Sequence, residues 1–235
     1  MAIGAALVFN IVLPINFNSP YKALDIQDFW RRWHITLSRF LTQYIYIPLG
    51  GNRRGKVRTY LNIMIIFLIS GFWHGAGWTF IFWGFLHGFA TVLNRYWKSF
   101  NYKLNKVVAW LITFNFVNIS WVFFRANTWE EALNVLKGMF GFNGIALPTF
   151  LKGKFEEIIL YDVMFIDFFA GSHIDLIYLL LFFLIVLYYT FKTKNSYEYM
   201  TSLVPNKRSM LFVSIIFIYS ILNFHKISEF LYFNF

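Results

Sequence analysis

The most constraining feature of this chain is the segment 174–191, in which Asp175 is the single charged residue. A helix needs about 20 apolar residues to cross the ~30 Å hydrocarbon core of a bilayer, and this segment is close to that length. Backbone groups in lipid must be hydrogen-bonded within the protein, which restricts spanning segments to helices and closed barrels. Residues 107–124 and 209–223 form further apolar segments. The sequence therefore predicts an all-α, polytopic membrane protein.

The composition agrees with this class. Of the 235 residues, 58% are hydrophobic and 14% are charged, whereas soluble domains carry about 25% charged residues. The net charge is +10, and the basic residues gather beside the apolar segments, so the positive-inside rule explains them better than a nucleic-acid partner does. This rule places 51–58, 95–106 and 192–208 in the cytosol and the loop 125–172 outside it. We expect a multi-pass protein of a cell membrane, in contact with membrane lipid.

The first fifty residues predict an interfacial segment. Residues 1–15 are too short for a complete span, and 16–20 have the composition of a turn. Asp25 is a candidate N-cap, and apolar residues recur at helical spacing from Ile26 to Tyr44, opposite a basic face. The pattern predicts one continuous amphipathic helix at the membrane interface, with His34 at the border of its apolar stripe.

The segment 59–93 predicts broken helices around a central histidine. Fifteen residues from Thr59 to Trp73 rise only about 22 Å as a helix, which is less than the hydrocarbon thickness. Glycines at 71, 75 and 77 then loosen the backbone before the apolar run resumes. Since both flanks are basic, we expect a re-entrant hairpin that carries His74 at its bend.

The histidines differ in what they indicate. His74 lies in an otherwise apolar run, where an ionisable residue is either a packed hydrogen-bonding group or a functional one such as a general base. His34 by itself is more typical of a structural or solvated residue. His87 has the setting of a helix-packing residue, and His173 and His225 are expected at span ends.

Other kinds of site have less support. No two histidines are three or four residues apart, no carboxylate accompanies His74, and cysteine is absent, so we expect no metal site. The segment 50–55, with Arg53 and Arg54, could hold a phosphate group. It is equally typical of a solvated basic loop at anionic lipid, which composition alone favours.

Six runs of the sequence form recognisable motifs: Asn16–Tyr21, Asp28–Ser38, Tyr46–Asn52, Gly71–Gly75, Trp121–Ala126 and Glu229–Phe233. Together these motifs resemble the membrane-bound O-acyltransferase family, in the branch with the alginate and peptidoglycan O-acetyltransferases. Family members are roughly twice as long, so the chain resembles a C-terminal half. The resemblance implies that residues 1–235 are the C-terminal part of one acyltransferase domain.

The resemblance also implies an activity and its residues. An acetyl group would pass from a cytosolic thioester, with acetyl-CoA as the donor and no permanently bound cofactor, to a hydroxyl of an extracytoplasmic polysaccharide or partner protein. His74 would be the catalytic base and His34 a second important histidine. Beyond what the resemblance implies, we expect Arg53 and Arg54 to contact the donor phosphates. We also expect Asp28, Trp30 and Trp73 to hold the histidines in place.

Three alternatives stay open from the sequence. D-alanyl transfer to teichoic acid is the alternative reaction within the family. A non-enzymatic membrane scaffold, or an inactive remnant, is the alternative to an enzyme. A transporter is supported only by the broken helix at residues 71–77.

Overall fold

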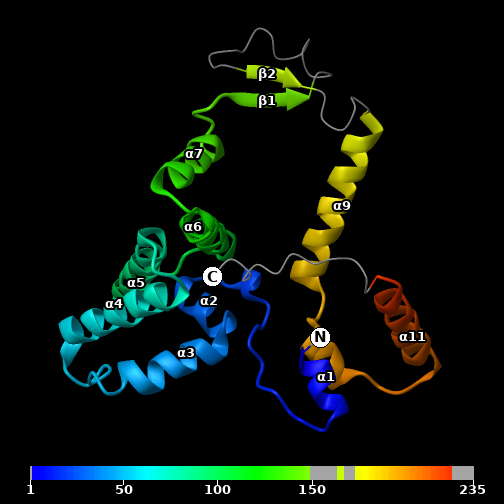
Figure 1. Cartoon of the computed structure of the whole chain (residues 1–235), viewed down its shortest axis with the longest axis horizontal. Helices are drawn as coiled ribbons and strands as arrows, with labels where there is room; N and C mark the ends of the chain where they lie inside the picture. The colour runs from blue at the N-terminus through cyan, green and yellow to red at the C-terminus, as the bar shows by residue number, and fades with distance from the viewer. Residues whose placement is uncertain (1, 149–162, 167–172, 224–235) are drawn as a thin grey trace. The chain divides into compact units, whose positions relative to one another are not determined.

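The structure is a computed structural model that describes residues 2–148, 163–166 and 173–223, and it separates into two compact units. The first unit covers Met1–Thr193 and the second Lys194–Phe235. The helices of the first unit are α1 (Ala2–Val8), η1 (Pro20–Lys22), α2 (Ile26–Arg32), α3 (Ile35–Leu41), η2 (Thr42–Tyr46), α4 (Gly55–His74), α5 (Trp78–Lys98), α6 (Lys106–Arg125), α7 (Trp129–Met139) and α9 (His173–Lys192) (Figure 1). The second unit contains α10 (Ser196–Ser202) and α11 (Lys207–Leu222).

The predicted helical fold is confirmed, with one short addition. Strands β1 (Ile145–Pro148) and β2 (Val163–Ile166) pair in parallel, with Ile145 opposite Val163. They lie in the segment 125–172, which we expected to be a loop and which also contains α7. The segment 192–208, also expected to be a loop, contains α10, which begins with a capping box between Asn195 and Glu198. That the chain is a single domain over residues 1–235 stays a prediction.

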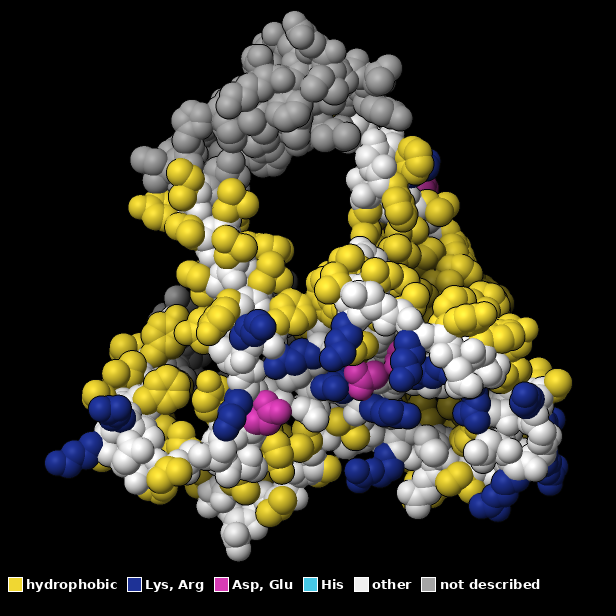
Figure 2. Space-filling view, turned by 180° about the vertical axis from the view of Figure 1, so that it is seen from behind, with side chains coloured by type: hydrophobic (Ala, Val, Ile, Leu, Met, Phe, Trp, Pro, Cys, Tyr) yellow, Lys and Arg dark blue, Asp and Glu magenta, His cyan; other side chains and the backbone are white. Residues whose placement is uncertain are grey.

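The helices agree with a membrane protein. Among the described residues, α4 and α6 are long and apolar enough to cross a membrane, and a third span results if Ile177–Lys192 and Ser196–Ser202 are counted together. In the right-hand half of Figure 2, Lys and Arg side chains gather in the lower part of the surface, below a broad hydrophobic area. Such an asymmetry fits a protein whose cationic side faces the cytosol.

Helix α4 is longer than the sequence indicated. It starts at Gly55 rather than Thr59 and ends at His74, so its 20 residues rise about 30 Å. The expected length of 15 residues was wrong because the basic residues Lys56 and Arg58 belong to its first turn. The predicted break is present: Gly75–Gly77 separates α4 from α5, and the two helices pack side by side (Figure 1). The re-entrant path in the membrane stays a prediction.

Glycines allow this close packing. A Cβ atom at Gly71 would overlap the backbone carbonyl of Phe80, and one at Gly84 would overlap that of Phe67. Small residues at a helix contact let two backbones approach, which compensates for the absence of a hydrophobic driving force between helices in lipid. The position of His74 at the end of α4 is therefore set by the glycine face of the helix pair.

The predicted continuous amphipathic helix is interrupted, which corrects the sequence-based expectation. Helix α2 ends at Arg32, α3 begins at Ile35, and His34 between them has φ 45° and ψ 52°, in the left-handed region. The chain around Asn16 pairs with this break: Ile35 donates its backbone N–H to the carbonyl of Asn16 at 3.0 Å, and Asn18 donates to that of Arg32 at 2.8 Å. These long-range bonds satisfy backbone groups that a continuous helix would have paired internally. The predicted cap is confirmed, because the Asp25 carboxylate accepts hydrogen bonds from two backbone amides of α2.

A buried hydrogen-bond chain joins α2, α5 and α6. The Trp30 indole donates to Nδ1 of His87 at 3.2 Å, and Nε2 of His87 lies 2.9 Å from the hydroxyl of Ser120, which donates to the carbonyl of Val117 at 2.8 Å. Indole N–H only donates, so Nδ1 of His87 accepts and Nε2 carries the hydrogen. His87 is fully buried with both ring nitrogens bonded, in agreement with its expected packing role.

We predict that Gly84→Ala destabilises the folded protein, by about 1–3 kcal/mol as in other overpacked sites. The added methyl group meets backbone, which cannot move without separating α4 from α5. The measurement is the midpoint of thermal unfolding in detergent, followed by fluorescence-detected size exclusion. Gly77→Ala is the matched control, because its Cβ would have only ordinary contacts, the nearest at 3.5 Å from the ring of Phe80. Equal midpoints for the two variants would contradict this account of the packing.

Candidate functional site

His74 lies in an aromatic enclosure at the end of α4. Its side chain is 7% exposed, although Trp73 beside it is 60% exposed. The imidazole centroid lies 4.7 Å from the ring of Trp73, 5.2 Å from that of Trp83 and 5.0 Å from that of Phe124. Three consecutive long helices, α4, α5 and α6, thus supply the residues around this imidazole. Its orientation depends on all three.

The second predicted histidine lies next to the first. The ring centroids of His34 and His74 are 6.3 Å apart, although 40 positions separate them in the sequence. Trp73 touches both, since its ring is 6.1 Å from that of His34. The structure therefore brings three of the predicted site residues together. A small group placed between the two imidazoles would be within reach of both.

Asn16 holds His34 in place, a role that the sequence analysis did not assign. Its Oδ1 lies 3.1 Å from the backbone N of Thr36, 2.8 Å from Oγ1 of Thr36 and 3.2 Å from Nδ1 of His34. A backbone N–H can only donate, so this atom of Asn16 is the oxygen, and Nδ1 of His34 must carry the hydrogen in the third bond. Nε2 of His34 then keeps its lone pair and can accept a proton or a hydrogen bond.

Burial also favours the neutral form of His34. Desolvation lowers the pKa of His34 from its ordinary value of 6.5. The folded chain therefore takes up this proton at a lower pH than the unfolded chain, and acidification below about pH 6.5 favours unfolding. At neutral pH the site contains an uncharged His34 with a fixed tautomer.

Two of the expected positioning residues do not contact the histidine pair directly. Asp28 forms an ion pair with Arg32 at 2.9 Å, one turn further along α2. Trp30 donates to His87 and packs against Trp83, with ring centroids 5.8 Å apart. Trp30 thus reaches His74 only through the Trp83 ring, whereas Asp28 stabilises α2.

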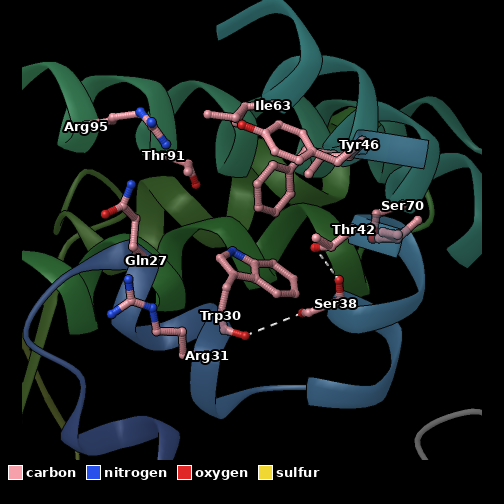
Figure 3. Close-up of a pocket in the computed structure, with 13 residues that line it drawn as sticks. Gln27, Trp30, Arg31, Ser38, Thr42, Tyr46, Ile63, Ser70, Thr91 and Arg95 are labelled. Atoms are coloured by element: carbon pink, nitrogen blue, oxygen red, sulfur yellow. Dashed lines mark hydrogen bonds between the residues drawn. The ribbon is translucent and has the colours of Figure 1, made fainter. Parts of the chain in front are cut away.

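A cavity of about 430 Å³ opens beside Trp30 (Figure 3). Figure 3 shows Gln27, Arg31 and Arg95 at one side of it and the hydroxyl residues Ser38, Thr42 and Ser70 at the other. The apolar residues that line the cavity are Trp30, Leu41, Ile63, Ile66 and Phe67.

The two sides of this cavity have unused polar groups. In the part of the chain that the structure describes, neither the Arg31 nor the Arg95 side chain has a hydrogen-bond or ion-pair partner. Ser70 is 1% exposed, and its hydroxyl also has no partner among the described residues. Ser70 precedes His74 by one turn of α4, about 6 Å along the axis. The cavity therefore offers a cationic mouth and a hydroxyl that lies close to the histidine pair.

The basic loop at 50–55 takes a different position. Arg53 and Arg54 are exposed and do not line this cavity. Gly50 and Gly51 have positive φ values of 101° and 54°, and the amide of Asn62 donates to the carbonyl of Gly51 at 2.9 Å. These features make the loop a tight turn fixed to α4. The structure does not bring its arginines to the histidines.

Residues 2–148, 163–166 and 173–223 contain no group of three His, Asp or Glu side chains that could hold a metal ion. His225 and the run Glu229–Phe233 lie outside the described residues, as does the side chain of His173.

We predict that Asn16→Asp raises the pKa of His34, because a carboxylate at this distance favours the imidazolium. Asn16→Ala removes the acceptor instead and leaves the Thr36 amide without its partner. The measurement is an NMR titration of histidine-labelled protein in detergent, with His34→Gln used to assign the signal. An unchanged His34 titration in Asn16→Asp would show that the two side chains are not hydrogen-bonded. Asn18→Asp is the control, because the Asn18 backbone N–H pairs with Arg32 and a carboxylate there tests general electrostatics.

Known proteins resemble this chain over much of its length. Residues 1–129 match the family model described as MBOAT, the membrane-bound O-acyltransferase family. The chain is 57% identical over 176 residues to a peptidoglycan O-acetyltransferase of Helicobacter pylori. The matched region covers 70% of this chain and 33% of that protein. It is 39% identical to a probable alginate O-acetylase AlgI of Azotobacter vinelandii, over 67% of this chain and 32% of that protein.

A more distant match is the teichoic acid D-alanyltransferase of Streptococcus thermophilus, 29% identical over 52% of this chain and 35% of that protein. The chain thus spans about a third of the length of the curated relatives that it matches. The family match covers more than half of the chain and includes both histidines of the site. The chain therefore belongs to the membrane-bound O-acyltransferase family.

Proposed function

We propose that the complete protein is an O-acetyltransferase that moves an acetyl group from a cytosolic thioester to a hydroxyl group outside the cytosol. The observation that carries this proposal is the pair of imidazoles, 6.3 Å apart, at the break between α4 and α5 of a chain from this family. A neutral imidazole can accept a proton near pH 7 and return it, which acyl transfer between a thiol and a hydroxyl requires.

His74 is the proposed general base. Its imidazole takes the proton of the acceptor hydroxyl while the oxygen attacks the thioester carbonyl, and it returns the proton to the departing thiolate. His34 has a fixed Nδ1–H and a free Nε2, which suits it to accept a hydrogen bond from the acceptor or the donor. Its role is to orient the reacting groups beside His74.

The cavity beside Trp30 is the proposed donor site, with acetyl-CoA as the donor. Its mouth offers Arg31 and Arg95, whose guanidinium groups match phosphate oxygens and have no partner within the described chain. Its apolar wall suits the extended arm of a thioester, and Ser70 at its inner side lies one turn from His74. Arg53 and Arg54 are the alternative phosphate contacts, and their exposure in a separate turn favours them less.

The proposed acceptor is a hydroxyl of a cell-envelope polysaccharide, reached directly or through a partner protein outside the cytosol. The identity is higher to the peptidoglycan O-acetyltransferase, 57%, than to the alginate O-acetylase, 39%, or the D-alanyltransferase, 29%. We therefore place peptidoglycan first and alginate second. D-alanyl transfer to teichoic acid is the third possibility within the same chemistry.

We predict that His74→Ala lowers acetyl transfer by about 10²–10⁴-fold, the range for loss of a general base. The assay uses the complete protein in detergent with radiolabelled acetyl-CoA and peptidoglycan fragments, and it counts label on the acceptor. Phe72→Ala is the matched control on the same helix, because Phe72 is 67% exposed and has no part in the site. Wild-type transfer by His74→Ala would overturn the proposal. If the wild-type protein and His74→Ala both transfer no more label than a membrane without the protein, a non-catalytic scaffold would be favoured.

We further predict that Arg31→Gln with Arg95→Gln raises the KM for acetyl-CoA by roughly tenfold or more. Hydrogen bonds to charged groups contribute about 1.5–3 kcal/mol, and 1.4 kcal/mol corresponds to a factor of ten. The same assay with Arg53→Gln and Arg54→Gln tests the alternative site. A KM change that follows the second pair and not the first would move the donor phosphates to the loop at 50–55.

A further inference from the structure

Trp83 has a buried hydrogen-bond donor that nothing in the described chain uses. Its side chain is 2% exposed, and Nε1 has no partner among the residues that the structure describes. Two other tryptophans use theirs: Trp30 donates to His87 at 3.2 Å and Trp110 donates to the carbonyl of Tyr21 at 2.8 Å. An indole N–H can only donate, and leaving it buried without an acceptor costs free energy. Such a group in a packed core calls for a role outside folding.

The position of Trp83 indicates this role. Its ring centroid lies 5.2 Å from that of His74, at an interplanar angle of 87°, and 5.1 Å from that of Phe124. Phe124 is also 5.0 Å from His74, so the three rings contact one another. On its other side, Trp83 packs against His87, with centroids 4.8 Å apart, and His87 is fixed by the chain from Trp30 to Ser120. The Trp83 ring, which carries the unpaired donor, is therefore held by packing on both sides, shielded from water, and in contact with the imidazole of the proposed base.

We propose that the Trp83 indole N–H donates a hydrogen bond to the thioester carbonyl oxygen as that oxygen becomes negatively charged. This inference rests on the proposed function and adds a catalytic residue to it. The acceptor oxygen forms a bond to the carbonyl carbon, its proton moves to the His74 imidazole, and the carbonyl electron pair moves onto oxygen. The carbonyl then re-forms, the carbon–sulfur bond breaks, and the thiolate takes the proton from His74.

This arrangement meets the requirements of an oxyanion site. A preorganised donor in a dry site stabilises developing charge without reorganising during the reaction. Because the indole N–H has no acceptor among the described residues, it gives up no hydrogen bond within that part of the chain when the substrate binds. The unpaired N–H of Trp83 lowers the stability of the folded protein, and in return it is available to stabilise the charge on the reacting oxygen.

The test is Trp83→Phe in the complete protein, assayed with radiolabelled acetyl-CoA and peptidoglycan fragments. This change keeps an aromatic ring and removes the N–H. We expect kcat to fall by about 10²–10³-fold, which is the loss found for one oxyanion donor, and the KM for acetyl-CoA to change by less than about threefold. The midpoint of thermal unfolding should not fall, since no hydrogen bond is lost.

Two tryptophan variants serve as controls. Trp30→Phe should lower the unfolding midpoint, because it leaves Nδ1 of buried His87 without its donor. Trp129→Phe should leave both the midpoint and kcat at wild-type values, because Trp129 is 43% exposed on α7 and packs against Phe82, away from the histidine pair. A Trp83→Phe protein that loses stability as Trp30→Phe does, with its specific activity unchanged, would show a structural role and overturn the proposal.

If Trp83→Phe does not fold, 3-benzothienyl-alanine at position 83 keeps the shape of the ring system and replaces N–H by sulfur. The same loss of kcat is expected, and wild-type kcat would overturn the proposal. Ser70→Ala is assayed in parallel, because Ser70, one turn before His74 on α4, has a buried hydroxyl without a partner among the described residues. A kcat loss confined to Ser70→Ala would assign the oxyanion contact to Ser70 instead. Inactive His74→Ala with fully active Trp83→Phe rejects this inference alone, whereas active His74→Ala rejects the proposed function.

Discussion

The hydrogen-bond chain through His87 is the constraint on which the site depends. One imidazole joins the Trp30 indole of α2 to the Ser120 hydroxyl of α6, and it does so from the middle of α5. Both nitrogens are used, so rotation of the ring would break two buried bonds together. Because Trp30 lines the cavity and Trp83 packs on His87, the proposed donor site and the surroundings of His74 both depend on the position of His87. His87, to which no chemical step is assigned, thus determines the geometry in which His74 and His34 can act.

Local patterns in the sequence predicted much of the fold, and long-range pairing accounts for what they missed. The long apolar helices α4 and α6, the Asp25 cap and the break at Gly75–Gly77 follow from apolar runs, a capping residue and flexible backbone. The interruption at His34 has no such signal, since neither glycine nor proline lies there and the apolar stripe continues past it. It exists because the chain near Asn16 supplies hydrogen-bond partners to the open turn. Helix α7 had a local signal, a Thr128 cap that accepts from the Glu131 amide, but charge in that segment favoured a loop.

The candidate site was likewise predicted only where local sequence motifs carry it. His74 and His34 were identified from their motifs, and the structure places them side by side. The arginines of the cavity were not identified, because Arg31 and Arg95 lie 64 positions apart and meet only when α2 packs on α5. Arg53 and Arg54 drew attention because they are adjacent in the sequence. Trp83 and Ser70 could not be identified from the sequence either, because an unpaired buried donor results from packing and leaves no pattern in the neighbouring residues.

The left-handed backbone at His34 limits which residues this position can hold. With φ 45° and ψ 52°, the site disfavours β-branched and bulky residues and admits glycine, asparagine, aspartate and histidine most readily. Glycine would lose the bond to Asn16, and aspartate would place a second acceptor against the Asn16 oxygen. Asparagine keeps both the backbone conformation and a neutral donor. The shape of the turn and the hydrogen bond to Asn16 together therefore favour histidine and asparagine at this position, before any requirement of catalysis applies.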